Sequence, residues 1–294
     1  MDLQGDDLTE AVVASFGDSP SERYQTVMSA LVRHLHAFAR EVELTEDEYF
    51  TAIDFLTRTG QASNEKRQEF VLLADVLGLS MLTVGLGNRK PPEATQSTVF
   101  GPFFVEGSPA AQLGDDIANG APGQPCFVSG RVLNTKGEPV AHARVETWQA
   151  DEDGYYDVQK DLDHPQNRAH LITDAEGNYS FWSVRPVAYP IPHDGPVGEL
   201  LQAGGRGWMR PAHIHFMVTA PGYGRLITHV FAAGDEYLDK DAVFGVKESL
   251  IAEFTEHAAG TEAPDGSTPD RPYYTVNYDL VLATVEETRA SGDR

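Results

Sequence analysis

Apolar residues between positions 20 and 90 recur at the three- and four-residue spacing of an amphipathic helix. The segment 19–22 offers a capping hydroxyl, Pro20 at the first helical position and Glu22 three residues on. The apolar stripe that follows contains Val27, Ala30, Leu31, Leu35 and Phe38. Thr45 begins a second predicted helix. Ser63 or Asn64 caps a third, which carries Leu79 and ends before Pro91-Pro92.

After residue 98 the pattern changes to short β-branched and aromatic runs separated by Gly, Pro, Asn and Asp. Such runs predict short strands, and their spacing indicates an antiparallel sandwich or barrel. The predicted strands are 126–133, 143–149, 177–184, 213–218, 226–231 and 274–280. We also predict a turn at 235–241, a helix over 242–254 and a surface loop at 257–272.

The expected fold class is therefore mainly β with an α-helical N-terminal domain. We place the helical domain at residues 1–98 and an antiparallel β-sandwich catalytic domain at residues 99–294. A helical block of this kind either adds a layer to the main core or builds a dimer contact, and the pattern leaves both open.

The composition is that of a globular protein, with 41% hydrophobic and 23% charged residues among 294. The net charge of −23 disfavours nucleic acid and anionic membrane surfaces as partners. Cys126, the single cysteine, excludes an internal disulfide and a cysteine-rich zinc site. No apolar run is long enough for a membrane helix, and the first residues are acidic rather than signal-like, so we expect a cytoplasmic protein.

His213 and His215 are the sharpest chemical feature of the sequence. They are two residues apart in a predicted strand, so both imidazoles face the same side of the sheet. Neutral imidazole is a ligand for iron, zinc, copper or nickel. Two histidines on a sheet surface fit the same pattern without a metal. The residues after His215 lack the glutamate that a cupin site would supply.

Tyr156 and Tyr189 are candidate partners for the two histidines, because each lies beside turn residues upstream of them. Phenolate is a hard anionic donor that favours a trivalent cation, so two phenolates and two imidazoles would suit non-haem Fe(III). Aromatic packing explains either tyrosine equally well when it is taken alone. The acidic run 235–241 lacks the central glycine and closing glutamate of an EF-hand loop.

These segments together resemble the intradiol ring-cleavage dioxygenases, and within that family the enzymes that act on hydroxyquinol. The resemblance covers nearly the whole chain. It depends on STVFGPFF at 97–104, ETWQA at 146–150, DGPVG at 194–198, RPAHIH at 210–215 and DAVFGVK at 241–247.

The resemblance implies a non-haem ferric ion held by Tyr156, Tyr189, His213 and His215. The family pattern Gly-x-Tyr selects Tyr156 over its neighbour Tyr155 as the ligand. Tyr189 is also implied as a base. Arg210 matches the family arginine beside the ring, although an arginine paired to a carboxylate at a strand start would look the same. His229 is a departure from the family, because related catechol enzymes carry a glutamine there, and we assign it a catalytic role as a hydrogen-bond donor.

The implied substrate-binding wall contains Arg210 together with Leu72, Asp75, Val99, Phe100, Gly101, Pro102, Phe103, Ile191, Pro192 and Val243. Asp75 is informative, because it interrupts the apolar run 70–74 on the helical face of Leu72 and Leu79. A carboxylate on an apolar face is costly unless it finds a donor, and a third ring hydroxyl would be one. A bond to the backbone or to an arginine would satisfy it as well.

The expected activity is cleavage of hydroxyquinol (1,2,4-trihydroxybenzene) by O2 to 3-hydroxy-cis,cis-muconate or maleylacetate, in the degradation of aromatic compounds. Catechol or a substituted catechol is the alternative substrate. A non-enzymatic transthyretin-like β-sandwich binding module and a zinc or copper hydrolase are alternatives of other classes, but both leave the tyrosines unexplained. The resemblance also implies a homodimer, with a phospholipid at its interface, and no nucleic-acid or membrane partner.

Overall fold

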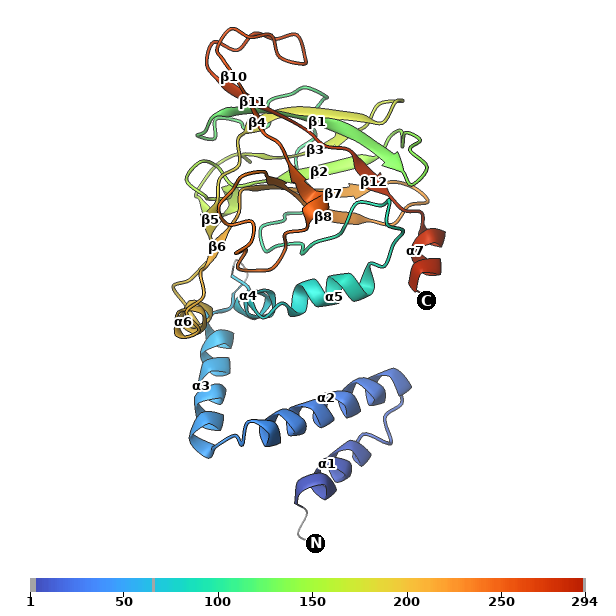
Figure 1. The fold of residues 1–294 in the computed structure, drawn as a ribbon, viewed down its shortest axis with the longest axis vertical. Coiled ribbons are helices and arrows are strands. Elements are labelled where there is room, and N and C mark those ends of the chain that lie inside the picture. Colours follow the sequence, from blue (N-terminus) through green and yellow to red (C-terminus); the bar gives the residue numbers. More distant parts are fainter. Residues whose placement is uncertain (1–3, 65–66, 293–294) are drawn as a thin grey trace. The chain divides into compact units, whose positions relative to one another are not determined.

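The computed structural model describes residues 4–64 and 67–292. The chain forms two compact units, Met1–Arg58 and Thr59–Arg294. The first unit holds the helices α1 (Gly5–Ala14) and α2 (Glu22–Glu41) and most of α3 (Glu46–Ala62). The second holds the remaining helices and every strand (Figure 1). Residues 59–98 belong to the same compact unit as the strands, so the boundary between the units lies after residue 58. Compact units are not the same as domains, and the predicted domain division after residue 98 stays a prediction.

Side-chain caps determine where α2 and α3 begin. The hydroxyl of Ser21 accepts a hydrogen bond from Tyr24 N at 3.2 Å, so α2 begins after Pro20 rather than at it. Thr45 and Glu48 form a reciprocal capping box before α3: Thr45 N donates to Glu48 Oε2 at 2.9 Å, and Glu48 N donates to Thr45 Oγ1 at 3.3 Å. The second predicted helix is thereby confirmed, whereas α1 was not predicted.

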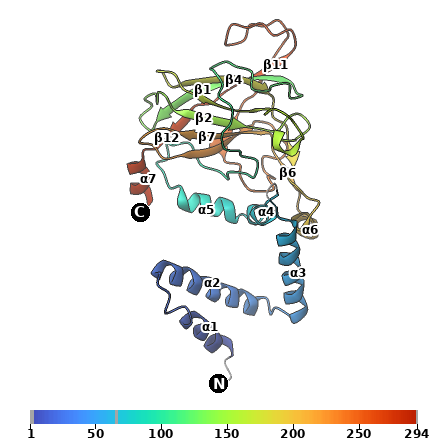
Figure 2. The same cartoon turned by 180° about the vertical axis from the view of Figure 1, so that it is seen from behind.

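The third predicted helix is two helices, α4 (Glu69–Val76) and α5 (Leu79–Gly87). Gly78 separates them, with a φ of +74° that glycine adopts without steric cost. Figures 1 and 2 both show α4 and α5 under the sheet that contains β7 and β8. No single helix in the described residues is long and apolar enough to cross a membrane, and α4 and α5 pass that test only as a pair bent by 80°.

Two five-stranded sheets form the sandwich. In one, β1 (Pro125–Asn134) has β4 (Asn178–Val184) on one edge and β11 (Tyr273–Asn277) and β12 (Leu280–Leu282) on the other, with β10 (Thr255–His257) outside β11. The other sheet has the order β3-β2-β7-β8-β9. Its strands are β3 (Arg168–Ile172), β2 (Arg144–Trp148), β7 (His213–Thr219), β8 (Leu226–Ala232) and β9 (Ile251–Ala252).

The main core lies between these two sheets. Val128 and Phe181 contribute to it from one sheet, and Val145, Ile214 and Phe216 from the other. The short strands β5 (Tyr189–Pro190) and β6 (Met209–Arg210) pair beside the sandwich. The helices α6 (Pro196–Ala203) and α7 (Val285–Gly292) and the 3-10 turns η1 (Asp157–Gln159) and η2 (Glu248–Leu250) complete the fold.

We expected an antiparallel sandwich, and the sandwich is present, but its sheets are mixed. β1 pairs in parallel with both β11 and β12, and β8 pairs in parallel with β9. The single strand predicted at 274–280 is broken between β11 and β12. The carbonyl of Tyr278 lies so close to Gly130 that a Cβ there would stand 1.9 Å from it, and Asp279 Oδ1 accepts a hydrogen bond from Arg131 N at 2.8 Å. The chain therefore bulges at this point before pairing resumes.

The prediction of a helix over 242–254 is wrong. The Asp241 carboxylate accepts hydrogen bonds from Val243 N at 3.3 Å and Gly245 N at 2.8 Å, which holds the backbone in a turn. Phe244 has a φ of +58°, which no right-handed helix permits. Only the short turn η2 and the strand β9 follow. Apolar spacing alone cannot reveal such a local competition between a side chain and the helical backbone.

Candidate metal centre

Three histidines from two adjacent strands lie side by side in the second sheet. His213 and His215 point to the same side of β7, and His215 is directly opposite His229 on β8. The ring centroids of His215 and His229 are 4.1 Å apart, and the ligand nitrogens of the three residues lie within 4.8 Å of one another. All three side chains are buried. The strand pairing therefore builds a histidine cluster suited to a metal ion.

Tyr156 and Tyr189 bring their phenolic oxygens to this cluster. Tyr156 Oη is 2.9 Å from His215 Nε2 and 3.0 Å from Tyr189 Oη, which is 3.4 Å from His213 Nε2. Tyr156 is fully buried, whereas the neighbouring Tyr155 is 53% exposed. Two phenols and two imidazoles thus converge, and Tyr155 points away from them.

The protonation of these groups suits a metal ion. His213 Nδ1 lies 2.6 Å from the Pro211 carbonyl, a contact that keeps the ring proton on Nδ1 and leaves Nε2 as the unprotonated nitrogen. Burial, then the charge of Arg210, lowers the pKa of His213 to about 3, and burial lowers the pKa of His215 well below its usual value. Both imidazoles are therefore neutral and able to act as ligands.

Without a cation, the environment keeps the two phenols protonated, which does not favour metal binding. Burial raises the pKa of Tyr156 well above its ordinary value, and the neighbouring Tyr189 raises it further. Burial also raises the pKa of Tyr189, although Arg210 and the hydrogen bond with Tyr156 act against it. A multivalent cation at the centre would reverse this balance and favour phenolate. The donor set consequently fits a highly charged metal ion.

Arg210 is held beside the cluster by a buried ion pair. Its Nε is 3.1 Å from Asp241 Oδ1, and its Nη1 is 3.3 Å from His213 Nε2. Burial would lower the pKa of Arg210, but the Asp241 carboxylate outweighs that effect and raises it, so the guanidinium stays charged. The structure thus contains both the arginine implied at the substrate ring and a carboxylate partner. Sequence reasoning placed Asp241 in a turn and in the motif 241–247, but gave it no role.

His229 lies against the histidine pair with one nitrogen occupied and one free. Its Nδ1 is hydrogen bonded to the Thr98 hydroxyl, and its buried Nε2 has no partner among the described residues. Burial lowers the pKa of His229 well below its usual value, so the ring is neutral. Thr98 was missed as a functional residue, because nothing in the sequence connects residue 98 to residue 229.

A cavity of about 950 Å³ opens beside Tyr189. Six of the predicted wall residues line it, namely Leu72, Asp75, Pro102, Phe103, Ile191 and Pro192. Asp75 is 5% exposed, and burial raises the pKa of its carboxyl despite a hydrogen bond with Ser80. The buried carboxyl therefore forms part of the wall of a cavity large enough for an aromatic substrate.

The other predicted wall residues are not among those that line this cavity. Val99 and Val243 pack in the apolar cluster that also contains Leu72. Phe100 packs edge-on against Trp148 at 5.8 Å between ring centroids. Gly101 approaches a metal-centre imidazole so closely that a Cβ there would stand 3.0 Å from His215 Cε1. These residues shape the centre, but they do not line the large cavity.

Aromatic stacking orients two of the candidate ligands. The Trp148 ring is stacked on His215 at 4.8 Å between centroids, and the Phe103 ring is stacked on Tyr156 at 4.5 Å. Trp148 was quoted only as part of a motif in the sequence, without a role. Its position against His215 follows from its place in β2, opposite that residue in β7.

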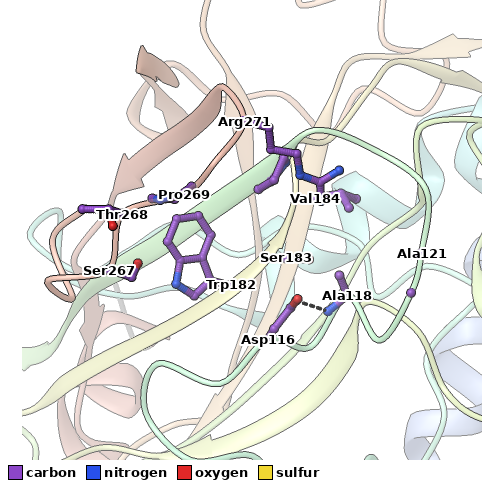
Figure 3. Close-up of a pocket in the computed structure, with 12 residues that line it drawn as sticks. Asp116, Ala118, Ala121, Trp182, Ser183, Val184, Ser267, Thr268, Pro269 and Arg271 are labelled. Carbon is purple, nitrogen blue, oxygen red and sulfur yellow. Dashed lines mark hydrogen bonds between the residues drawn. The ribbon is translucent and has the colours of Figure 1, made fainter. Parts of the chain in front are cut away.

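Figure 3 shows a separate cavity of about 290 Å³ between β4 and the 267–271 loop. Trp182 and Arg271 line it, and the carboxylate of Asp116 accepts a hydrogen bond from Ala118 N at 2.9 Å. The Trp182 indole donates to Asp265 at 2.7 Å. None of the centre's donors lines this cavity, so we place no reaction there.

Comparisons with known proteins agree on one family. The family model described as "Dioxygenase" matches residues 99–284, and the model described as "Catechol dioxygenase N terminus" matches residues 21–95. Hydroxyquinol 1,2-dioxygenase of Nocardioides simplex is 55% identical over 277 residues, or 94% of each chain. The enzyme of the same name from Rhodococcus opacus is 54% identical over 94% of this chain and 93% of its own. The crystal structure of hydroxyquinol 1,2-dioxygenase from Pseudomonas putida DLL-E4 matches with a TM-score of 0.88 and 45% identity, covering 94% of this chain and 97% of its own.

Proposed function

Since the chain belongs to the intradiol ring-cleavage dioxygenases, we propose that it cleaves hydroxyquinol with O2 to 3-hydroxy-cis,cis-muconate or its keto form, maleylacetate. Both oxygen atoms of O2 enter the product, and no external reductant is consumed. The observation that carries the proposal is the convergence of two phenols and two imidazoles beside the large cavity, within one buried cluster.

We propose Tyr156, Tyr189, His213 and His215 as the ligands of a ferric ion. When bound, that ion would act as a Lewis acid that binds the oxygens of two adjacent hydroxyl groups of the substrate and withdraws electron density from the aromatic ring. His229 offers a third imidazole in the same cluster. We propose it instead as a hydrogen-bond donor through Nε2, because its Nδ1 is already bonded to Thr98.

Tyr189 is the better proton acceptor of the two tyrosines. The two phenols share a hydrogen bond at 3.0 Å. Burial raises the pKa of both, but the Arg210 charge acts against this at Tyr189, whereas Tyr189 raises the pKa of Tyr156 further. We propose that Tyr189 Oη takes a proton from a substrate hydroxyl. Arg210, kept charged by Asp241, then stabilises negative charge on the bound ring.

Two buried carboxyls, Glu69 and Asp75, lie on the wall of the large cavity. Asp75 is proposed to recognise the third hydroxyl of hydroxyquinol, because Glu69 is already paired with Arg67 at 2.7 Å. Asp75→Ala should lower kcat/KM for hydroxyquinol by roughly 10- to 100-fold and change kcat/KM for catechol much less, since only the triol loses a hydrogen bond. The control is Asp161→Ala, which removes an exposed carboxylate from the mouth of the same cavity. Equal losses on both substrates would contradict the role of Asp75 in recognising the third hydroxyl, whereas a preference of the unaltered protein for catechol would move the substrate assignment to catechol or a substituted catechol.

A visible absorption spectrum separates the enzyme from the other classes. A ferric ion bound by tyrosinate should give a wine-red protein whose band shifts when hydroxyquinol is added without O2. A protein that stays colourless after ferric iron is offered would contradict the proposal. It would favour a transthyretin-like binding module or a zinc or copper hydrolase.

A homodimer is proposed from the surface of α2. Its large apolar side chains Tyr24, Val27, Leu31, Leu35 and Phe38 are 44 to 55% exposed. Their three- and four-residue spacing gives a continuous stripe on one face of the helix. We propose that a second copy and a phospholipid cover this stripe. Analytical ultracentrifugation of Leu31→Glu should then show monomer, and mass spectrometry of an organic extract should show lipid from the unaltered protein.

The cytoplasm is the proposed location. The single cysteine, Cys126, is buried and free, which suits a reducing compartment.

A further inference from the structure

A second polar cavity, of about 250 Å³, lies beside the segment 96–98 and away from the large cavity. Its lining consists of Val84, Gly85, Asn88, Arg89, Lys90, Gln96, Ser97, Lys247 and Ser291. Among these described lining residues three are cationic and none is acidic, in a chain whose net charge is −23. We refer to this space as the lysine cavity.

The two lysines have N–H donors that are not used in hydrogen bonds between described residues. Lys90 Nζ donates to the Thr95 carbonyl at 2.8 Å, and Lys247 Nζ donates to the Ser97 carbonyl at 3.0 Å and to Gln96 Oε1 at 3.4 Å. An ammonium group has three N–H donors, so two remain on Lys90 and one on Lys247. The buried hydroxyl of Ser97 has no hydrogen-bond partner among the described residues. Among the described residues that line the cavity with these groups, none carries a negative charge.

The two cations also act on each other. Burial, and then the charge of Lys247, lower the pKa of Lys90 to about 8. Burial lowers the pKa of Lys247 as well. Two like charges in a partly buried space are destabilising unless an opposite charge joins them. An anion between them would remove this repulsion and use the free donors.

We propose that the lysine cavity binds one small divalent anion, an inorganic oxyanion or a dicarboxylate, between Lys90, Lys247 and Ser97. Its volume corresponds to roughly eight water molecules, which is room for phosphate or a short dicarboxylate. The site adjoins the metal centre through the backbone, because Ser97 lines the cavity while the next residue, Thr98, is bonded to His229. The inference does not depend on the proposed ring cleavage.

Isothermal titration of the metal-loaded protein with inorganic phosphate, and separately with maleate, tests this site at constant ionic strength maintained with chloride. One saturable site per chain is expected outside the metal centre. Lys90→Met and Lys247→Met should each weaken binding at this site about tenfold or more, because each removes a charge-assisted contact. Lys90→Arg keeps the charge and should retain it. Lys240→Met removes an exposed lysine elsewhere and serves as the matched control.

Which of the two probes binds distinguishes an oxyanion site from a dicarboxylate site. The absence of saturable binding by either probe would overturn the proposal, as would equal affinity in both methionine variants and the unaltered protein. If the lysines only brace the backbone carbonyls, the methionine variants lose stability and binding does not change. Ser97→Ala tests the site even if the lysine variants do not fold. It removes one uncharged donor and should weaken binding several-fold.

Discussion

Asp241→Asn should destabilise the protein through the buried ion pair that holds Arg210. The side chains of Arg210 and Asp241 are 5% and 2% exposed, with 3.1 Å between Nε and Oδ1. The substitution keeps the shape and one acceptor oxygen, but it leaves the guanidinium charged and buried without its counter-charge. Because only one of the two charges is removed, the cost is that of leaving the Arg210 charge buried without compensation.

The magnitude follows from what asparagine retains. Breaking a buried pair costs about 3–5 kcal/mol. Gly245 N donates to Oδ2 and Val243 N to Oδ1, so the single acceptor oxygen of asparagine can keep only one of these bonds, and we expect a loss of at least about 3 kcal/mol. A loss of about 3 kcal/mol lowers Tm by roughly 6–12 °C in a unit of this size. Urea unfolding of metal-free protein, with the unfolding slope compared between variants, measures the free energy directly.

The loss should depend on pH with a defined sign. Burial would raise the pKa of Asp241, but the Arg210 charge and hydrogen bonds outweigh it, so the folded-state pKa lies below the ordinary value of 3.8. The stabilisation from Asp241 is therefore complete above that ordinary pKa and disappears as pH falls through the folded-state value. The difference between Asp241→Asn and the unaltered protein should be constant from pH 5 to 8 (roughly the range in which this carboxyl does not titrate) and should shrink below about pH 4.

Asp239→Asn is the matched control, because it removes an exposed carboxylate from the same loop and should change stability by less than about 0.5 kcal/mol. The reasoning is refuted if Asp241→Asn costs less than about 1 kcal/mol at neutral pH, the value of an exposed pair. A loss that is the same at low and neutral pH would show that packing, and not charge, gives Asp241 its effect.

Three further substitutions test the surroundings of the centre. Gly101→Ala puts a Cβ 3.0 Å from His215 Cε1 at a φ of +77°, so it should lower metal content as measured by atomic absorption, whereas Gly107→Ala, with a similar φ and no neighbour within 4 Å, should not. Thr98→Val should lower kcat by roughly tenfold, because it leaves His229 Nδ1 without its partner, and Thr98→Ser should restore kcat; equal rates in both variants would contradict this. Because burial lowers the pKa of Lys90 to about 8, the unfolded chain binds its proton more tightly. Urea unfolding should therefore show the unaltered protein gaining stability relative to Lys90→Met between about pH 8 and pH 10.5, by at most about 1.4 kcal/mol per pH unit, and a constant difference would refute the assignment.

The sequence by itself determined those features that depend on neighbouring residues. The capping box at Thr45 and Glu48 and the two-residue spacing of His213 and His215 are local patterns, and the chain folds as they predict. The turn-punctuated strands also form, except that the one predicted at 274–280 is broken in two. The family motifs also led to Tyr156, Tyr189 and Arg210, which the fold brings to one place. Their roles stay proposals, but their proximity is a property of the structure.

Tertiary structure alone decided the contacts between residues far apart in the chain. No periodicity connects Thr98 to His229, or Trp148 to His215. Strand register sets the second pair, and the first forms where the segment of Thr98 runs along β8 and Thr98 N donates to the Ile227 carbonyl at 3.0 Å. Asp241 is the clearest case. Its local sequence indicates a turn before a helix, yet the folded chain uses the same carboxylate to stop that helix and to neutralise a buried arginine. Local pattern predicts which elements form, whereas the balance of buried charge exists only after distant elements have packed together.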